Sequence, residues 1–235
     1  MKDYKMILFD LDGTLLPMEL ETFMGGYLKS IATKMATYGY EPKTLGAALW
    51  DSIAKMMAND GAKTNEEVFW DRFCEIYGKD AIKDKKTIDD FYRNEFQNVK
   101  NYCGFNPKAS ETVYKLKAAG FRVALATNPF FPQYATFSRI RWAGLEPSDF
   151  ELITTYENSH TCKPNLSYYK EVLSTLNIMP SETLMVGNDA LEDMIAKELG
   201  IDVFLLTDCL INTKNRDISQ YPQGSFDELL TYIGL

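Results

Sequence analysis

The chain has 235 residues, of which 46% are hydrophobic, 25% charged and 13% aromatic, a balance that excludes a disordered protein and allows one large domain or two smaller ones. The net charge of −8 argues against a nucleic-acid surface or an anionic membrane as a partner. Four scattered cysteines and a single histidine argue against a zinc site and a disulfide framework, and with no evident export signal they favour the cytoplasm.

The chain begins with a short apolar run that ends in acidic residues. Residues 5–9 predict a buried strand, and Asp10, Asp12 and Gly13 follow at once. Two carboxylates about 4 Å apart repel by roughly 4 kcal/mol at an effective dielectric near 20. A hard divalent cation such as Mg²⁺ would offset this repulsion, because it prefers oxygen ligands. A solvated Asp-x-Asp-Gly turn is the alternative interpretation.

The segment from residue 19 to residue 102 has the periodicity of packed helices. Apolar residues recur at helical spacing, as at Leu45, Leu49, Ile53 and Met57, and glycine or proline residues divide the segment into about four helices. We therefore assign residues 17–104 to a helical bundle. Its methionines and aromatic residues are expected to form its core.

After residue 105 the pattern alternates between strands and helices. The predicted strands are residues 121–126, 151–155, 183–186 and 203–206, and the predicted helices are residues 110–119, 132–143, 168–176, 191–199 and 226–233. This alternation predicts an α/β fold with a parallel sheet and helices on both faces. Residues 1–16 and 105–235 would form this core, with the helical bundle inserted after the first strand.

Polar residues end four of the predicted strands, namely Asp10, Thr127-Asn128, Asn188-Asp189 and Thr207. In an open parallel sheet, ligands bind outside the carboxyl ends of the strands, so these groups should meet at one rim. Carboxylates, a hydroxyl and an ammonium group from Lys163 suit phosphoryl transfer through a covalent aspartyl phosphate. The sequence therefore predicts an active site at this rim.

The two N-terminal acids can divide the chemistry between them. Asp10 would attack phosphorus, and since an anion then approaches a dianion, a metal must neutralise the encounter. Asp12 would protonate the leaving oxygen as a general acid and then activate the hydrolytic water as a base.

The other polar residues would hold the phosphoryl group and the metal. Thr127 and the amide of Asn128 could bind phosphoryl oxygens, and Lys163 could add a fixed positive charge where negative charge spreads in the transition state. Asn188, Asp189 or both would complete the shell of Mg²⁺.

These residues resemble, in order and separation, the four motifs of the haloacid dehalogenase-like (HAD) hydrolase superfamily: Asp10-Leu11-Asp12-Gly13-Thr14, Thr127, Lys163 before Pro164, and Gly187-Asn188-Asp189 through Asp193. The resemblance implies a magnesium-dependent phosphatase of a small phosphorylated metabolite, with residues 17–104 as a type I helical cap. It also implies Asp10 as the nucleophile, Asp12 as the acid and base, and a metal held by the Asp10 carboxylate, the Asp12 carbonyl and the fourth motif, with Asp193 behind the ligands.

One departure and two alternatives stay open at this point. Many members have aspartate directly after the fourth-motif glycine, where this chain has Asn188, so the metal could face either Asn188 with Glu192 or Asp189 with Asp193. A β-phosphoglucomutase-like phosphomutase would use the same residues. A receiver-like signalling domain also pairs a phosphorylatable aspartate with threonine and lysine, although on a shorter chain.

Overall fold

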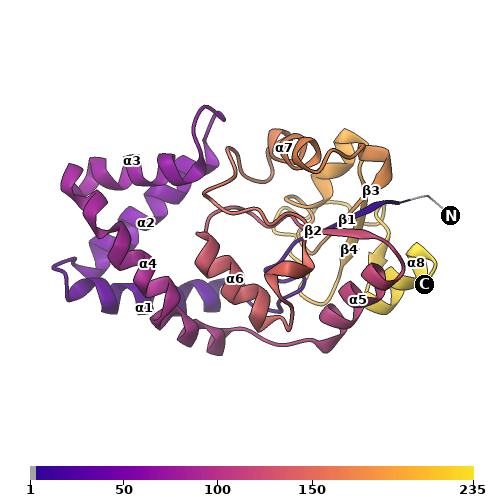
Figure 1. Ribbon diagram of the computed structural model, residues 1–235, viewed down its shortest axis with the longest axis horizontal. Coiled ribbons are helices and arrows are strands. Elements are labelled where there is room, and N and C mark those ends of the chain that lie inside the picture. The colour runs from indigo at the N-terminus through magenta and orange to yellow at the C-terminus, as the bar shows by residue number, and fades with distance from the viewer. Residues whose placement is uncertain (1–3) are drawn as a thin grey trace.

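A parallel sheet of five strands forms the centre of the computed structural model, which describes residues 4–235 (Figure 1). The spatial order is β2-β1-β3-β4-β5, and every neighbouring pair is parallel. The strands are β1 (Met6–Phe9), β2 (Arg122–Leu125), β3 (Thr183–Gly187), β4 (Asp202–Leu206) and β5 (Gln223–Gly224). The predicted α/β fold is confirmed; the two-residue β5 was not predicted.

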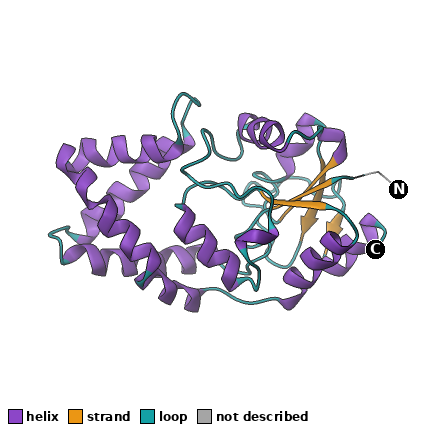
Figure 2. Ribbon diagram, in the orientation of Figure 1, coloured by secondary structure: helices purple, strands orange, loops and turns teal. Residues whose placement is uncertain are grey.

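Helices cover both faces of the sheet (Figure 2). Successive strand residues point to opposite sides, so Ile7 and Phe9 pack with α5 and α8, whereas Met6 and Leu8 pack with α7 and η5. The helical elements after the insertion are α5 (Pro107–Ala118), α6 (Gln133–Trp142), η3 (Pro147–Asp149), α7 (Leu166–Leu176), η4 (Pro180–Glu182), η5 (Met194–Leu199) and α8 (Phe226–Ile233), where η denotes a 3₁₀ helix.

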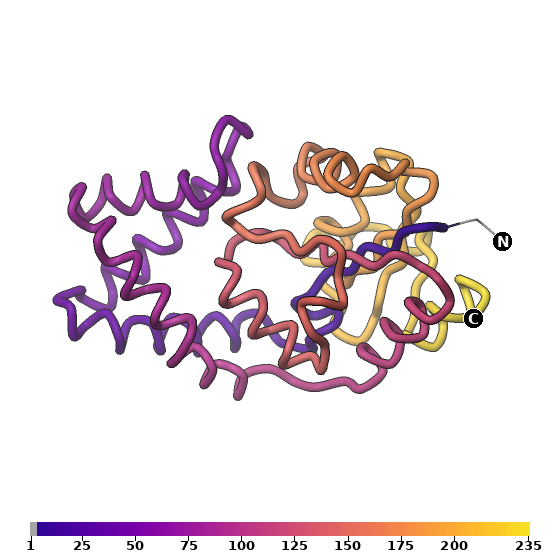
Figure 3. Tube along the Cα trace, viewed as in Figure 1, coloured from indigo at the N-terminus to yellow at the C-terminus, as the bar shows by residue number. Residues whose placement is uncertain are grey.

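The chain between β1 and α5 forms a separate helical layer beyond the carboxyl ends of the strands, on the left in Figures 1 and 3. Its elements are α1 (Leu20–Ala36), α2 (Pro42–Met57), α3 (Asn65–Tyr77), η1 (Lys79–Asp84), α4 (Lys85–Arg93) and η2 (Glu95–Tyr102). The four predicted helices are thus present. None of the helices within residues 4–235 combines the length and apolar character needed to cross a membrane.

An aromatic cluster joins this helical insertion to the rest of the protein. Tyr27 packs edge-on against Phe96 and Phe131, with ring centroids 6.1 and 5.2 Å apart, and Phe131 belongs to the loop before α6. The buried hydroxyl groups of Tyr27 and Tyr92 lie 2.7 Å apart, so each satisfies the other. Burying these rings contributes much of the apolar stabilisation of the insertion.

Besides side-chain contacts such as those of Gln97 with Ser138 and Trp142, backbone hydrogen bonds attach the insertion at two places. Where it leaves and re-enters the core, the amide of Gly104 donates to the carbonyl of Pro17 at 2.7 Å. At the start of α3, the amide of the fully buried Asn65 donates to the Ser159 carbonyl at 2.8 Å, and the Glu66 amide donates to the Tyr156 carbonyl, also at 2.8 Å. The second attachment lies on the segment that leads to Lys163.

The predicted strand at residues 151–155 is wrong. The segment forms only an isolated bridge between Leu125 and Ile153 at the edge of β2. The reason is local, because the side chain of Asn158 accepts from the Thr155 amide at 2.8 Å and donates to the Ile153 carbonyl at 2.9 Å. These bonds turn the chain before a ladder can extend.

The predicted α-helix at residues 191–199 is also wrong, since only the 3₁₀ helix η5 forms there. Asp189 Oδ1 accepts from the amides of Leu191 and Glu192 at 2.7 and 2.9 Å, and Asp193 Oδ2 accepts from the Asp189 amide at 2.9 Å. Carboxylates that bind nearby amides compete with the helical ladder, so a tight turn replaces the first helical turn.

Candidate active site

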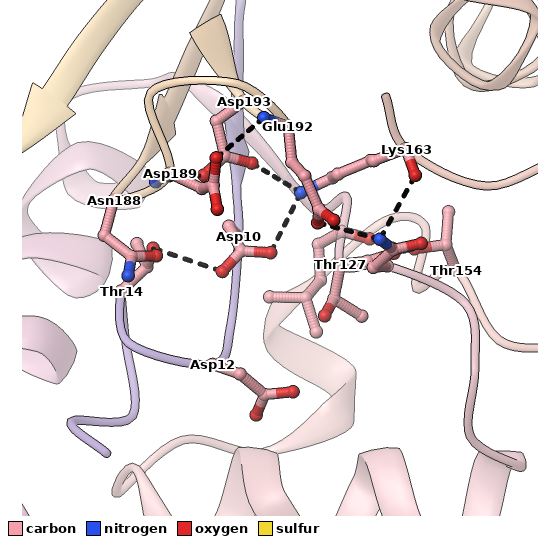
Figure 4. Close-up of polar contacts among 12 residues, drawn as sticks. Asp10, Asp12, Thr14, Thr127, Thr154, Lys163, Asn188, Asp189, Glu192 and Asp193 are labelled. Atoms are coloured by element: carbon pink, nitrogen blue, oxygen red, sulfur yellow. Dashed lines mark hydrogen bonds and ion pairs between the residues drawn. The ribbon is translucent and has the colours of Figure 1, made fainter. Parts of the chain in front are cut away.

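The strand register brings the predicted polar residues to one edge of the sheet (Figure 4). Phe9 of β1 is paired with Leu125 of β2 and with Val186 of β3. The residues that follow these three positions therefore leave the sheet at the same level, and Asp10 N still donates to Val186 O at 2.9 Å. The ends of β1, β2 and β3, which are far apart in sequence, therefore meet at one edge of the sheet, as predicted.

Asp10 lies at the centre and shares a buried lysine with Asp193. Lys163 Nζ donates to Asp10 Oδ1 at 2.9 Å and to Asp193 Oδ1 at 2.6 Å, and Lys163 is only 1% exposed. Burial alone would lower the pKa of Lys163, but the carboxylates of Asp10 and Asp193 outweigh burial and raise it. The lysine is therefore a fixed positive charge directly beneath Asp10.

The second oxygen of Asp10 faces Thr14 and Asn188. Thr14 Oγ1 donates to Asp10 Oδ2 at 3.2 Å and to Asn188 Oδ1 at 2.9 Å. The amide of Asn188 is fixed because its Nδ2 donates to the Cys209 carbonyl at 2.7 Å. Gly13 permits this approach, since it has a φ of +86° and an added Cβ would lie 2.3 Å from Asn188 Nδ2.

The fourth-motif acids each have a separate partner. Asp193 is turned towards Lys163, and Glu192 towards Asn128. Asp189 Oδ1 is engaged by two backbone amides of the turn that follows it. An added Cβ at Gly187 would lie 2.1 Å from Asp193 Oδ2, so only glycine lets Asp193 reach the lysine.

Asp12 is held by an arginine that the sequence analysis missed. The guanidinium of Arg139 in α6 donates through Nη1 to Asp12 Oδ2 and lies over the Phe131 ring at 4.4 Å from its centroid. Burial raises the pKa of Asp12, and the positive charge of Arg139 opposes this rise without cancelling it. Asp12 Oδ1 is buried and has no hydrogen-bond partner among the described residues, so it is free to meet a ligand.

Thr127 and Asn128 form the rim beside Asp10. The carbonyl of Thr127 accepts from Thr154 Oγ1 at 2.7 Å and from the Tyr168 hydroxyl at 2.9 Å, which fixes the backbone at this position. Asn128 Nδ2 donates to Glu192 Oε2 at 2.8 Å, while Asn128 Oδ1 is buried without a partner in the described part of the chain. Burial raises the pKa of Glu192 to about 7.

The raised pKa of Glu192 predicts a pH-dependent stability. Because this pKa lies above the ordinary value of 4.5, the folded state holds an extra proton between the two, and stability falls as the pH rises from about 4.5 to 7. We expect Glu192→Gln to remove this loss. Between pH 4.5 and pH 8, the free energy of unfolding should then fall less in the variant than in the wild type, by up to about 3 kcal/mol. Urea unfolding of both proteins at pH 4.5 and pH 8, without metal, measures this difference.

Glu198→Gln, at an exposed position of the 3₁₀ helix η5 that follows Glu192, is the matched control and should leave the pH dependence of the wild type unchanged. An unchanged pH dependence in Glu192→Gln would contradict the prediction.

A cavity of about 370 Å³ lies between the sheet and the insertion. Its polar lining, on the side of the sheet, consists of Asp10, Asp12, Thr127, Asn128, Asn188, Asp189, Glu192, Asp193 and Thr213. Its apolar lining consists of Met18, Leu20, Phe23, Met24, Trp50, Ile53, Met57, Phe130, Phe131 and Ile211.

Two expectations from the sequence are corrected here. Thr207 does not join the site; it is exposed, and its amide donates to the Gly224 carbonyl at 3.1 Å. Met57 is not part of the core of the insertion but is 51% exposed and faces the cavity, as does Trp50, which is 48% exposed. Helical spacing cannot tell a face that packs on protein from one that borders a cavity.

The donor set at Asp10 consists of oxygen atoms of mixed type. Among residues 4–235, no group of three or more His, Cys, Asp or Glu side chains is placed to hold a metal ion. A cation next to Asp10 would therefore depend on the amide oxygen of Asn188 and on backbone carbonyl oxygen as well as on carboxylate. Such an all-oxygen set suits Mg²⁺ and not a soft metal.

The family model of the haloacid dehalogenase-like hydrolases matches residues 4–200 of the chain. The chain therefore belongs to this family of hydrolases, and the prediction of an enzyme of this class is confirmed. The α/β sheet and the buried Asp10 beside Lys163 are consistent with that membership.

The chain is also similar to individual curated enzymes and to a solved structure. The chain is 26% identical to a phosphoglycolate phosphatase of Psychrobacter arcticus over 201 residues, which cover 83% of this chain and 79% of the relative. It is 26% identical to a phosphoglycolate phosphatase of Colwellia psychrerythraea, covering 97% and 94%. The HAD phosphatase structure from Thermococcus onnurineus shares the fold, with a TM-score of 0.62, 19% identity and 98% of each chain covered.

Proposed function

We propose that this hydrolase is a magnesium-dependent phosphatase that cleaves a small phosphate monoester through an aspartyl phosphate on Asp10. The observation that carries the proposal is the setting of Asp10, with one oxygen on Lys163, the other on Thr14, and the cavity above. The similarity to curated phosphatases over most of the chain supports it. Residues 17–104 would act as a helical cap over the site.

In the first step, a carboxylate oxygen of Asp10 attacks phosphorus and the bond from phosphorus to the ester oxygen breaks. The leaving oxygen takes its proton from Asp12, which burial predisposes to hold one. Arg139 holds Asp12 in position and stabilises the negative charge that the carboxylate gains when the proton has gone. Thr127 and Asn128 would bind phosphoryl oxygens, since both line the same face of the cavity.

In the second step, water attacks the phosphorus of the aspartyl phosphate, and Asp12 now takes the proton of the water. The acyl phosphate bond breaks, phosphate leaves, and the Asp10 carboxylate is restored. Lys163 keeps its charge throughout and stabilises the negative charge on Asp10 and on the phosphoryl oxygens in both transition states.

The residues around Asp10 fit a magnesium ion by their chemistry. Asp10 Oδ2, the Asp12 backbone carbonyl and Asn188 Oδ1 would hold it, and Asn188 is the better candidate of the fourth motif because its Oδ1 and Asp10 Oδ2 contact the same Thr14 hydroxyl. Bound there, the cation would supply the charge that lets the anionic nucleophile approach a phosphate dianion. Asp193 would serve behind these ligands by fixing Lys163.

Phosphate release from a panel of small monoesters, 2-phosphoglycolate included, tests the proposal. We expect release with Mg²⁺, its loss when EDTA removes the metal, and its return when excess Mg²⁺ is added. Release that is indifferent to chelation would contradict the metal requirement. Transfer between two positions of a sugar phosphate without release would indicate a phosphomutase, and a long-lived phosphoprotein would indicate a receiver-like domain.

A further inference from the structure

The charged side chains that line the cavity above Asp10 are all acidic in the part of the chain that the structure describes. Lys163 and Arg139 are the cations bound to the acids of the site, and neither is available to a second charge on a ligand. Each is 1% exposed, Lys163 is bound to Asp10 and Asp193, and Arg139 is bound to Asp12. Among the described residues, the lining of the cavity therefore contains no positively charged side chain.

The opposite wall is apolar, and α1 and α2 each contribute three residues to it. Trp50, Ile53 and Met57 are three and four residues apart, so they share one face of α2. The other face of α2 is buried, with Leu49 2% and Met56 0% exposed. Trp50 and Met57 therefore border the cavity with about half of their surface exposed, whereas Ile53 also packs against the hydrophobic core. A concave apolar surface next to convergent polar groups is the usual form of a small-molecule site.

From this lining we propose that the substrate is the phosphate monoester of an uncharged, largely apolar alcohol, aromatic or branched, and not an ester with a second anionic group. The inference rests on the proposed phosphatase function and adds to it the class of the leaving group. Phe23 and Phe130 belong to the same apolar lining.

The exclusion of a second anion follows from charge and burial. A carboxylate on the leaving group would enter a cavity whose charged lining residues, such as Glu192 and Asp189, are acids, without a cation to replace its hydration. An apolar leaving group would instead cover the exposed surfaces of Trp50 and Met57. The ester named for the relatives, 2-phosphoglycolate, carries such a carboxylate, so we expect it to be a poor substrate here.

Benzyl phosphate and 4-carboxybenzyl phosphate test the inference, because their leaving alcohols differ by one remote carboxylate. With Mg²⁺ present, we expect kcat/KM for benzyl phosphate to exceed that for the carboxylated ester by about 10- to 100-fold. Methyl phosphate, which is too small to reach α2, should be turned over with a low kcat/KM and serves as the reference for chemistry without the apolar contact.

Met57→Lys places a cation at the exposed edge of the apolar wall and should raise kcat/KM for the carboxylated ester about tenfold. Ile76→Lys is the matched control, since Ile76 is also an exposed apolar residue of the insertion but does not line the cavity. It should leave the ratio between the two esters unchanged.

The outcomes separate the two proposals. Equal or preferred turnover of the carboxylated ester by the wild type would overturn the inference and leave the phosphatase function intact. Turnover of none of the esters with Mg²⁺ would overturn the phosphatase function and the inference together.

Discussion

Asp10→Asn is expected to lower the rate of phosphate release by at least about 10³-fold, because an amide is a poor nucleophile towards phosphorus and forms no acyl phosphate. The substitution keeps the shape of the side chain, so Lys163 and Thr14 retain an oxygen or nitrogen partner at the same place. The measurement is phosphate release under single-turnover conditions with saturating Mg²⁺, together with circular dichroism to establish that the variant is folded.

Asp71→Asn is the control, since Asp71 is an exposed acid that binds Lys63 on the surface of the insertion. Its turnover should match that of the wild type. Turnover in Asp10→Asn within a factor of about ten of the wild type would refute Asp10 as the nucleophile.

Lys163→Met should affect stability as strongly as activity. It leaves the carboxylates of Asp10 and Asp193 buried, 7% and 1% exposed, without their shared cation. Removing one partner of a buried ion pair costs about 3–5 kcal/mol of unfolding free energy. Urea unfolding at pH 7.5, without metal, measures this loss, and turnover with Mg²⁺ should fall at the same time because the fixed charge beneath Asp10 is gone.

The double variant Lys163→Met with Asp193→Asn separates the two effects. Neutralising Asp193 removes one of the two uncompensated charges, so we expect part of the lost stability to return while turnover stays low. A single variant that unfolds at the same urea concentration as the wild type would show that Lys163 is not a structural counter-ion.

Much of the sheet and of its rim could be predicted because the evidence is local. The apolar run before Asp10, and the strands that end at Thr127 and Asn188, each carry their own pattern, and parallel pairing then places these ends at one edge. The family resemblance of the same residues agrees with the matched family model. The roles of the individual side chains stay predictions that the proposed experiments test.

Arg139 could not be predicted, because a single arginine in a helical pattern is typical of a solvated surface. Only the packing of α6 turns it inward onto Asp12. Trp50 and Met57 show the complementary difficulty, since their helical spacing is the same whether the helix face meets protein or a cavity. The failed strand at residues 151–155 has a third cause, a side-chain amide that redirects the backbone over a few residues.

The attachment of Asn65 and Glu66 to the loop before Lys163 limits how a substrate can enter. Lifting residues 17–104 as a rigid lid, about the paired chain crossings at Pro17 and Gly104, would break two buried backbone hydrogen bonds and pull on the loop that carries the lysine. Opening the cavity to a substrate in this way would therefore also move the loop that positions Lys163.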